Sequence, residues 1–230
     1  MKTLFFDTGP IISLTTNNLL WLLPKLKEAF NGEFAITDGV KFELVQKPLE
    51  TKKFKFEALQ VQGMIEQRVL DVITSPAIRQ KAAYLQNLAN RIYVIRRQPM
   101  QILQQGECET LAAALLSNVP VIVCDERITR TLLEAPHQLQ ELYERRLHEK
   151  VEVNDQALHE FTKAVKGIKV IRSVELVLIA YEKGFLDQFL VKVPNVRREL
   201  LESLLWGVKL HGAAISEDEI AELVKMELKR

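Results

Sequence analysis

The stretch that decides the fold is residues 119–127, which read VPVIVCDER. Val119–Cys124 is the most apolar β-like run of the chain, and it ends abruptly at Asp125-Glu126-Arg127. A short apolar run bounded by turn residues and charges is typical of a buried strand in a parallel sheet. Thr3–Phe6 repeats the pattern, because TLFF is followed at once by Asp7. The sequence therefore predicts two buried strands that each end in a carboxylate.

Further strand and helix signals alternate along the chain. Phe34–Thr37 and Ile168–Ile171 are short strand candidates, and Val69–Thr74 is a third. Ile11–Phe30 has a mostly helical pattern, which Pro24 should break or kink near Leu23. The other helical segments are Pro76–Arg97, Glu107–Ser117, Ile128–Val165, a helix capped by Ser173, Asn195–Trp206 and Glu217–Lys229. This alternation predicts an α/β fold with a mainly parallel sheet that helices cover on both faces.

Four acidic residues fall where such a sheet presents functional groups, beyond the carboxyl ends of its strands. Asp7 and Asp125 each end a strand. Glu43 lies one turn into the helix after the second strand, and Glu109 lies in the first turn of the helix before Asp125. Simpler explanations stay open for each residue alone. The two aspartates can cap helices, Glu109 can favour a helix N-terminus, and Glu43 can be a solvated helix residue.

The joint pattern predicts more than the single residues do. Carboxylates that converge in one crevice repel each other strongly unless a cation compensates their charge. Carboxylate oxygens are the ligands that a hard divalent ion such as Mg²⁺ or Mn²⁺ prefers. We therefore expect a metal site that is formed by Asp7, Glu43, Glu109 and Asp125.

The segments around these acids resemble the PIN-domain (PilT N-terminus, VapC-like) family. LFFDTGPII at residues 4–12 is similar to the opening strand of the family, and VKFEL at residues 40–44 resembles its second acidic segment. GECETLAAAL at residues 106–115 is the sharpest match, to an alanine-rich helix that begins Gly-Glu-x-Glu. VIVCDERITR at residues 121–130 resembles the last acidic segment, in the branch with paired acids followed by arginine. Residues 170–184 resemble the closing strand and helix of that branch.

The resemblance implies a three-layer α/β/α fold and a Mg²⁺- or Mn²⁺-dependent endoribonuclease that cleaves RNA phosphodiester bonds with metal-activated water. Its catalytic and metal-binding positions correspond here to Asp7, Glu43, Glu109 and Asp125, with Glu126 as the alternative to Asp125 as fourth ligand. Thr8 and Glu107 would support the site. Arg127 and Arg130 lie one turn apart and would bind a substrate phosphate, or else form salt bridges with Glu126 or Glu134.

The resemblance also suggests how the chain is organised and what it meets. Residues 1–190 would form a PIN-like nuclease domain with expanded helical segments at about 47–105 and 127–167, and residues 191–230 a C-terminal helical extension. Some members of the family are toxins paired with an antitoxin, so candidate partners are an RNA substrate, a second copy of the chain and an antitoxin-like protein. The expanded segments weigh against a toxin role, because typical toxins of the family are much shorter.

Two further functions compete with an active ribonuclease. One is a catalytically weak PIN module that binds RNA or a protein partner, because a weakened acidic site looks nearly the same in sequence. The other is a phosphatase or a structure-specific DNA nuclease with a related acidic site. Metal-dependent stabilisation without cleavage would select the binding module, and a comparison of RNA with DNA substrates would separate the DNA nuclease.

Composition sets broader limits. The 31 basic and 30 acidic residues give a net charge of +1, so any contact with RNA needs local positive charge. No apolar run approaches the length of about 18 residues that spans a bilayer. Asp7 interrupts the first apolar run, unlike in a signal peptide, and we expect a cytoplasmic protein without a membrane partner. Cys108 and Cys124 are expected to be buried thiols in a reducing compartment.

Several remaining patterns bear on function. KKFKF at residues 52–56 interleaves basic and aromatic side chains, which would suit single-stranded RNA, although it also fits the amphipathic start of a helix. His137, His148, His159 and His211 lack the spacing of a helical zinc site. The chain has no Walker loop and no GxGxxG motif, and no serine lies in a nucleophile elbow. We therefore expect no zinc, no nucleotide cofactor and no serine triad.

Overall fold

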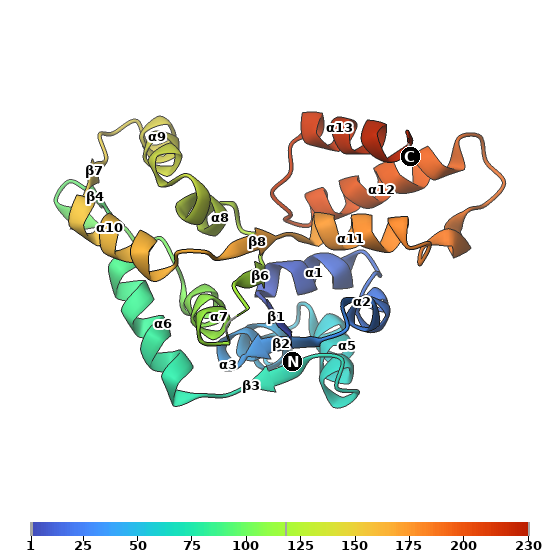
Figure 1. Ribbon diagram of the computed structural model, residues 1–230, viewed down its shortest axis with the longest axis horizontal. Helices are drawn as coiled ribbons and strands as arrows, with labels where there is room; N and C mark the ends of the chain where they lie inside the picture. Colours follow the sequence, from blue (N-terminus) through green and yellow to red (C-terminus); the bar gives the residue numbers. More distant parts are fainter. Residues whose placement is uncertain (1, 118, 230) are drawn as a thin grey trace.

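A five-stranded parallel sheet forms the centre of the computed structural model, which describes residues 2–117 and 119–229 (Figure 1). Its strands lie in the order β3-β2-β1-β6-β8, and each neighbouring pair is parallel. The connection order reverses beside β1, so the switch point at which α/β sheets bind ligands lies between β1 and β6. The strands are β1 (Thr3–Phe6), β2 (Glu33–Thr37), β3 (Asp71–Ile73), β6 (Val121–Val123) and β8 (Lys169–Ile171).

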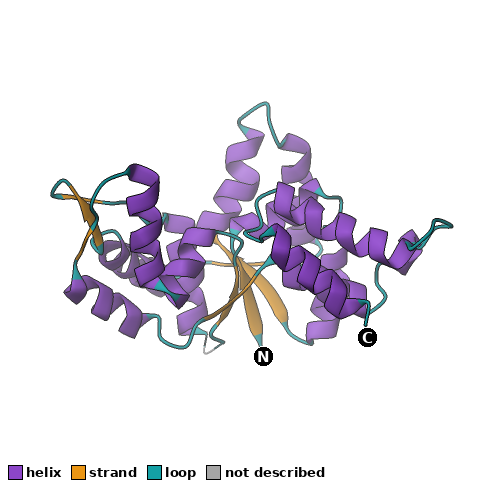
Figure 2. Ribbon diagram, turned by 90° about the horizontal axis from the view of Figure 1, so that it is seen from above, coloured by secondary structure: helices purple, strands orange, loops and turns teal. Residues whose placement is uncertain are grey.

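Helices lie on both faces of this sheet, which gives three layers, α/β/α (Figure 2). Successive side chains of a strand point to opposite faces. Leu4 and Phe6 of β1 accordingly belong to one buried cluster, whereas Phe5 between them belongs to the other. Strands buried on both sides read as continuous apolar runs, which is why TLFF shows no polar alternation. The predicted α/β fold with a mainly parallel central sheet is confirmed.

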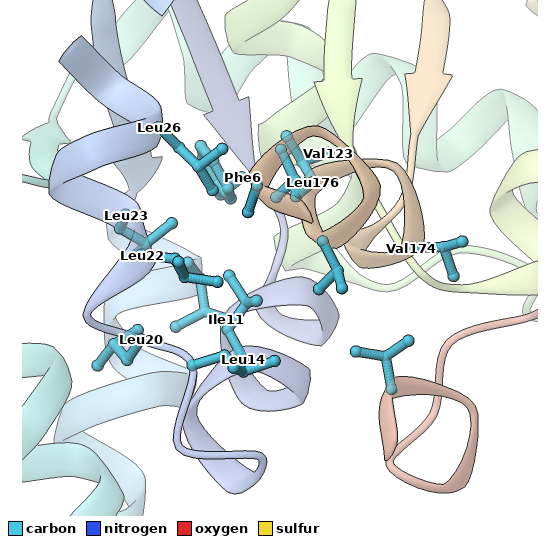
Figure 3. Close-up of a cluster of buried hydrophobic side chains, with 14 of the residues drawn as sticks. Phe6, Ile11, Leu14, Leu20, Leu22, Leu23, Leu26, Val123, Val174 and Leu176 are labelled. Carbon is cyan, nitrogen blue, oxygen red and sulfur yellow. The ribbon is translucent and has the colours of Figure 1, made fainter. Parts of the chain in front are cut away.

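The first buried cluster lies between the sheet and helices from both ends of the chain. Figure 3 shows Ile11 and Leu14 of α1 beside Leu22, Leu23 and Leu26 of α2, near Phe6 of the sheet. Spacings of three and four residues place these side chains on one face of each helix. The elements of this layer are α1 (Thr8–Thr16), α2 (Leu22–Phe30), α3 (Asp38–Lys41), the π-helical turn η1 (Phe42–Gln46), α4 (Lys47–Leu49), α5 (Lys55–Glu66) and α11 (Ser173–Glu182).

The second buried cluster lies on the opposite face of the sheet. It contains Phe5 and Ala35 of the sheet and the apolar side of α7, and it extends to a small antiparallel sheet in the order β5-β4-β7. Cys108 and Cys124 are buried, free thiols in this cluster, as predicted. Its helices are α6 (Pro76–Ala89), α7 (Gln105–Leu116), α8 (Arg127–Glu134), α9 (Pro136–Leu147) and α10 (Asp155–Ala164), and its strands β4 (Tyr93–Ile95), β5 (Gln98–Pro99) and β7 (Glu152–Val153).

Three predicted helices are divided differently from the expectation. Pro24 does not break a helix near Leu23, because it lies in the first turn of α2, where a missing N–H costs no intrahelical bond. The predicted helix Pro76–Arg97 ends at Ala89 and is followed by a β-hairpin. The predicted helical stretch Ile128–Val165 is divided at Pro136 and also contains β7.

The C-terminal residues add two helices, of which the first packs against α11 and the second against the first (Figure 1). These are α12 (Val196–Leu210) and α13 (Glu217–Glu227), and a short 3₁₀ turn, η2 (Asp187–Phe189), precedes them. Leu201 and Leu205 of α12 and Ile220 of α13 belong to the same buried cluster as Phe6 and Ile11. The helices of residues 191–230 therefore share the core of the preceding residues. Within the described ranges, no helix is long and apolar enough to span a membrane.

Arg172, directly after β8, joins the C-terminal helices to the sheet. Its side chain is buried, and Nη2 donates to Glu219 Oε1 of α13 over 2.6 Å. Nη1 donates to the Ala214 carbonyl over 3.0 Å, and Glu175 of α11 accepts from the same guanidinium. One buried cation thus links β8, α11 and the segment that leads into α13.

We expect Arg172→Ala to lower the free energy of unfolding by about 2 kcal/mol. The substitution leaves Glu175 and Glu219 without their cation, but both remain partly in water, so the loss is smaller than for a fully buried pair. Urea unfolding followed by circular dichroism measures the change. Glu217→Ala is the matched control, because the Glu217 side chain is exposed and its ion pair with Lys209 should contribute less than about 0.5 kcal/mol. Equal urea midpoints for the Arg172 variant and wild type would contradict the role of this ion pair.

Candidate active site

An acidic cleft opens beyond the carboxyl ends of β1 and β6, at the switch point of the sheet. Its volume is about 270 Å³. Side chains from elements far apart in the sequence line it, and the described residues among them include no lysine and no arginine. Five of them are carboxylates, namely Asp7, Glu43, Glu107, Asp125 and Glu126.

Asp7, which follows β1, is buried in the cleft, with only 6% of its surface exposed. It holds the N-cap position of α1 but makes no side-chain capping hydrogen bond, so capping does not explain it. The Cys124 thiol donates to Oδ2 over 3.5 Å, and in the part of the chain that the structure describes Asp7 forms no ion pair. Burial, together with the charges of Glu107 and Glu43, raises the pKa of Asp7 to about 7.

Glu43 reaches the cleft from the π-helical turn η1. Thr37 caps the preceding helix α3 by accepting from the Val40 amide, as expected for a threonine after a strand. Single π-helical turns occur often at functional sites. The Thr8 hydroxyl donates to Glu43 Oε2 over 2.6 Å and fixes that carboxylate. A Cβ at residue 106 would lie 3.3 Å from Glu43 Oε1, so Gly106 allows α7 to approach.

Glu107 and Glu109 lie on opposite sides of α7, because residues two apart on a helix do not face the same way. Glu107 lines the cleft, where Oε2 accepts from the Gln104 amide over 2.6 Å and Oε1 from the Thr129 hydroxyl over 2.9 Å. Burial raises its pKa. Glu109 is 2% exposed, does not line the cleft, and accepts from the Gly39 amide and Gln105 Nε2, each over 2.8 Å. The structure therefore brings Glu107 to the site in place of Glu109.

Asp125 is a buried junction between β6, α1 and α11. Its Oδ1 accepts from the Ser173 amide over 2.7 Å, and Oδ2 accepts from the hydroxyls of Ser13 and Ser173 over 2.7 and 2.8 Å. Burial raises the pKa of Asp125, and these hydrogen bonds oppose the rise. Helix capping, the simpler explanation for Asp125, belongs to Glu126, whose Oε1 accepts from the Ile128 amide. Ser173 does not cap α11, because its hydroxyl is directed to Asp125.

We expect Asp125→Ala and Asp125→Asn to separate the scaffold role of this residue from its charge. Alanine leaves both donors of the fully buried Ser173 without an acceptor and leaves the Ser13 hydroxyl only the His211 carbonyl at 3.4 Å, which should lower the free energy of unfolding by about 3 kcal/mol. Asparagine keeps one acceptor oxygen, and its NH₂ can donate to the rotated serine hydroxyls, so the loss should stay near about 1 kcal/mol. Thermal and urea unfolding of both variants measure the difference. Equal losses for the two would contradict the hydrogen-bonding role.

The predicted phosphate-binding arginines do not line the cleft. Arg127 is exposed and Arg130 is partly buried, and within residues 2–117 and 119–229 neither forms an ion pair with Glu126 or Glu134. Their binding of a substrate phosphate stays a prediction. The cleft is lined instead by His211 and Gly212, between α12 and α13. Nδ1 of His211 lies 2.8 Å from the Gly207 carbonyl, so Nδ1 is the protonated nitrogen and Nε2 is left for other contacts.

A comparison with protein families shows which family the chain belongs to. A family model described as a PIN domain, DUF3368, matches residues 3–137, more than half of the chain. The chain belongs to the PIN-domain family. No curated protein and no solved structure matches it. PIN domains are generally nucleases, and they typically use divalent metals, so the fold is of a nuclease type. In this PIN domain the matched residues include all five carboxylates of the cleft, whereas Ser173 and His211 lie beyond the match.

The donor atoms of the PIN-domain cleft suit a hard divalent cation, because all five acidic side chains offer carboxylate oxygens. Burial and, next to it, the charges of neighbouring carboxylates raise the pKa values of Asp7 and Glu107, so a bound cation would favour their charged forms. Among the described residues, no three Asp, Glu, His or Cys side chains are grouped as a preformed metal cluster. The cleft therefore offers the ligand atoms that a divalent cation prefers, and metal binding would draw the carboxylates closer together.

Proposed function

We propose that this PIN domain is a Mg²⁺- or Mn²⁺-dependent endoribonuclease. The observation that carries the proposal is the gathering of five carboxylates on one cleft around Asp7, whose pKa burial raises to about 7. A cleft of this charge repels the phosphates of RNA unless a cation lies between them. Membership of a nuclease family supports hydrolysis of a phosphodiester bond as the reaction.

The proposed metal ligands are Asp7, Glu43 and Glu107, with Asp125 or Glu126 as the fourth. A bound divalent cation supplies neutralisation of the phosphate oxygens and activation of water. The chain itself supplies orientation. Thr8 holds Glu43 and Thr129 holds Glu107, while Ser13 and Ser173 hold Asp125. Second contacts of this kind keep the ligands in a productive geometry, because each carboxylate then has few other orientations.

Cleavage of a labelled single-stranded RNA with Mn²⁺ or Mg²⁺, compared with EDTA, tests the proposal. Separate labels on the two ends distinguish internal cleavage from degradation that starts at an end. We expect internal products with 5′-phosphate and 3′-hydroxyl ends in metal and none in EDTA. Cleavage of DNA of the same sequence at an equal rate would favour a DNA nuclease, and metal-independent cleavage would contradict the proposal.

A second candidate is a catalytically weak PIN module that binds RNA or a protein partner. Two observations favour it: the described carboxylates are not grouped as a preformed metal cluster, and Asp125 already accepts three hydrogen bonds. Thermal stabilisation by Mn²⁺ with no cleavage of any RNA would select this candidate. A homodimer, an antitoxin-like partner and a cytoplasmic location stay predictions, which sedimentation, co-purification and fractionation can test.

A further inference from the structure

A surface of aromatic and basic side chains lies beside the acidic cleft. We call it the KKFKF surface, after residues 52–56, which read Lys52-Lys53-Phe54-Lys55-Phe56. Phe54 is 56% exposed and Phe56 is 69% exposed. Helix α5 begins at Lys55, so the alternative expectation that the motif starts a helix holds, but neither phenylalanine is on the buried side of that helix. Exposed aromatic side chains that gather at one place mark a binding surface rather than a core.

The KKFKF surface and the acidic cleft are contiguous. Phe54 forms one wall of a small apolar pocket of about 100 Å³. Ile12 and Glu43 line both this pocket and the acidic cleft, so no element separates the two. Leu44 and Val61 form its buried side. A polymer that crosses the cleft can therefore continue directly onto Phe54.

The backbone of Phe54 is held in a conformation that bulky residues rarely adopt. Its φ is +63° and its ψ is 19°, in the left-handed region that favours glycine. The Phe54 carbonyl accepts from the Ala58 amide over 3.0 Å, and the Thr51 hydroxyl donates to the Lys53 carbonyl over 2.9 Å, which fixes this turn. Phe54 is 56% exposed, so the apolar pocket that it lines covers less than half of the residue. Strained residues with little packing often serve binding.

Charge identifies the kind of ligand. Lys52, Lys53 and Lys55 are all exposed, and none forms an ion pair among the residues that the structure describes. An apolar protein surface would match the rings but would leave three cations without counterions. A single-stranded nucleic acid offers both a planar base for each ring and a phosphate for each lysine. Lysine and phenylalanine alternate over residues 53–56, and each nucleotide of an RNA strand likewise offers one phosphate and one base.

We propose that the KKFKF surface binds the single-stranded RNA that flanks the cleaved bond, with bases stacked on Phe54 and Phe56 and phosphates bound by Lys52, Lys53 and Lys55. The inference rests on the proposed function and adds that the substrate is unpaired for several nucleotides beside the cut. Stacking is tolerant of base identity, because every base has a flat face. The surface therefore selects for unpaired RNA rather than for a sequence.

A double-mutant cycle tests this proposal in the full-length chain. Fluorescence anisotropy measures the dissociation constants of wild type and of Phe54→Ala/Phe56→Ala for an oligouridine and for oligouridines with abasic nucleotides on the 5′ or the 3′ flank. We expect the double variant to bind intact RNA about 10-fold or more weakly, and wild type to lose as much affinity when one flank is abasic. The double variant should then bind intact and abasic RNA equally, since the lost contact is the same one.

Two control variants keep the test decisive. Phe54→Leu/Phe56→Leu retains apolar side chains without aromatic faces, and it should bind as weakly as the alanine variant. Leu59→Ala removes a comparably exposed apolar side chain from the same helix, α5, and should leave RNA binding unchanged. Wild type that binds intact and abasic RNA equally would overturn the proposal, as would an effect on self-association in sedimentation without an effect on RNA. Discrimination between the two RNAs by a wild type that never cleaves would refute the ribonuclease and leave this binding surface intact.

Discussion

Replacement of Asp7 by asparagine is expected to reduce metal-dependent RNA cleavage by about 100-fold or more while it stabilises the metal-free protein. The carboxylate lines the cleft, is 6% exposed, and interacts with the charges of Glu107 and Glu43. Asparagine has nearly the same shape, but it offers one neutral oxygen and removes a buried charge that its neighbours repel. A variant that is inactive because it is unfolded would melt below wild type, whereas we expect this one to melt above it in EDTA.

The pH dependence of the free energy of unfolding is a second test of the role of Asp7. The pKa of Asp7 is raised from 3.8 to about 7 in the folded chain, so between these values the folded state holds a proton that the unfolded state has lost. The contribution of this group is fully present below about pH 4 and is lost as pH rises through about 7. One group changes the free energy of unfolding by at most about 1.4 kcal/mol per pH unit.

Urea unfolding in EDTA at pH 5 and pH 8 measures this contribution. Wild type should lose more stability than Asp7→Asn between the two pH values. Burial also raises the pKa of Glu107 and Asp125, so these groups add a background of the same sign to both proteins, and only the difference reports Asp7. Parallel pH profiles would show that Asp7 does not carry the raised pKa. A variant that retains full Mn²⁺-dependent cleavage would remove Asp7 from the proposed metal site.

The central sheet could be predicted because its strands are short, apolar and ended by polar residues. Thr3–Phe6 is observed with the expected bounds, and Ile168–Ile171 and Val69–Thr74 differ from β8 and β3 only at their ends. The β-hairpin after α6 could not be predicted. Its turn is formed by Arg96 and Arg97, which both have positive φ values that arginine rarely adopts and that the sequence does not signal.

The position of a carboxylate could be predicted where it directly follows a strand, because the geometry of a parallel sheet then fixes its place. Asp7 and Asp125 both line the cleft for this reason. The tertiary partners of these acids could not be found in the same way. Ser13, Ser173 and His211 come from α1, α11 and the segment after α12, and only the folded chain brings them together. Neither serine lies in a catalytic motif, and both act by holding Asp125.

The choice between Glu107 and Glu109 is the sharpest difference between sequence and structure. GECE places two acids in one helical turn, and their spacing of two residues allows only one to face the cleft. Which one faces it depends on the rotation of α7 about its axis, and that rotation is set by packing. Glu107 has the capping-box partner Gln104, a signal that lies in the sequence but that also fits a purely structural residue.

Glu107→Gln and Glu109→Gln, compared side by side, decide this choice. We expect Glu107→Gln to lower the maximal cleavage rate in Mn²⁺ by about 100-fold with little loss of stability, because it removes a charge that faces the cleft. Glu109→Gln should cleave at nearly the wild-type rate but unfold with about 1–2 kcal/mol less free energy. Its neutral amide weakens the bond to the Gly39 amide at the N-terminus of α3 and places an NH₂ group against Gln105.

The measurements are the cleavage rate at saturating RNA and the urea midpoint in EDTA, made on the same preparations. Both substitutions remove one negative charge from α7, so the overall charge of the protein cannot explain a difference between them. An inactive but stable Glu109→Gln together with an active Glu107→Gln would place Glu109 at the metal and would require α7 to rotate when the cation binds. An active Glu109→Gln with an inactive Glu107→Gln would instead identify Glu107 as the third ligand. Its neighbour Gly106 has no side chain, which lets Glu43 and α7 line the same cleft.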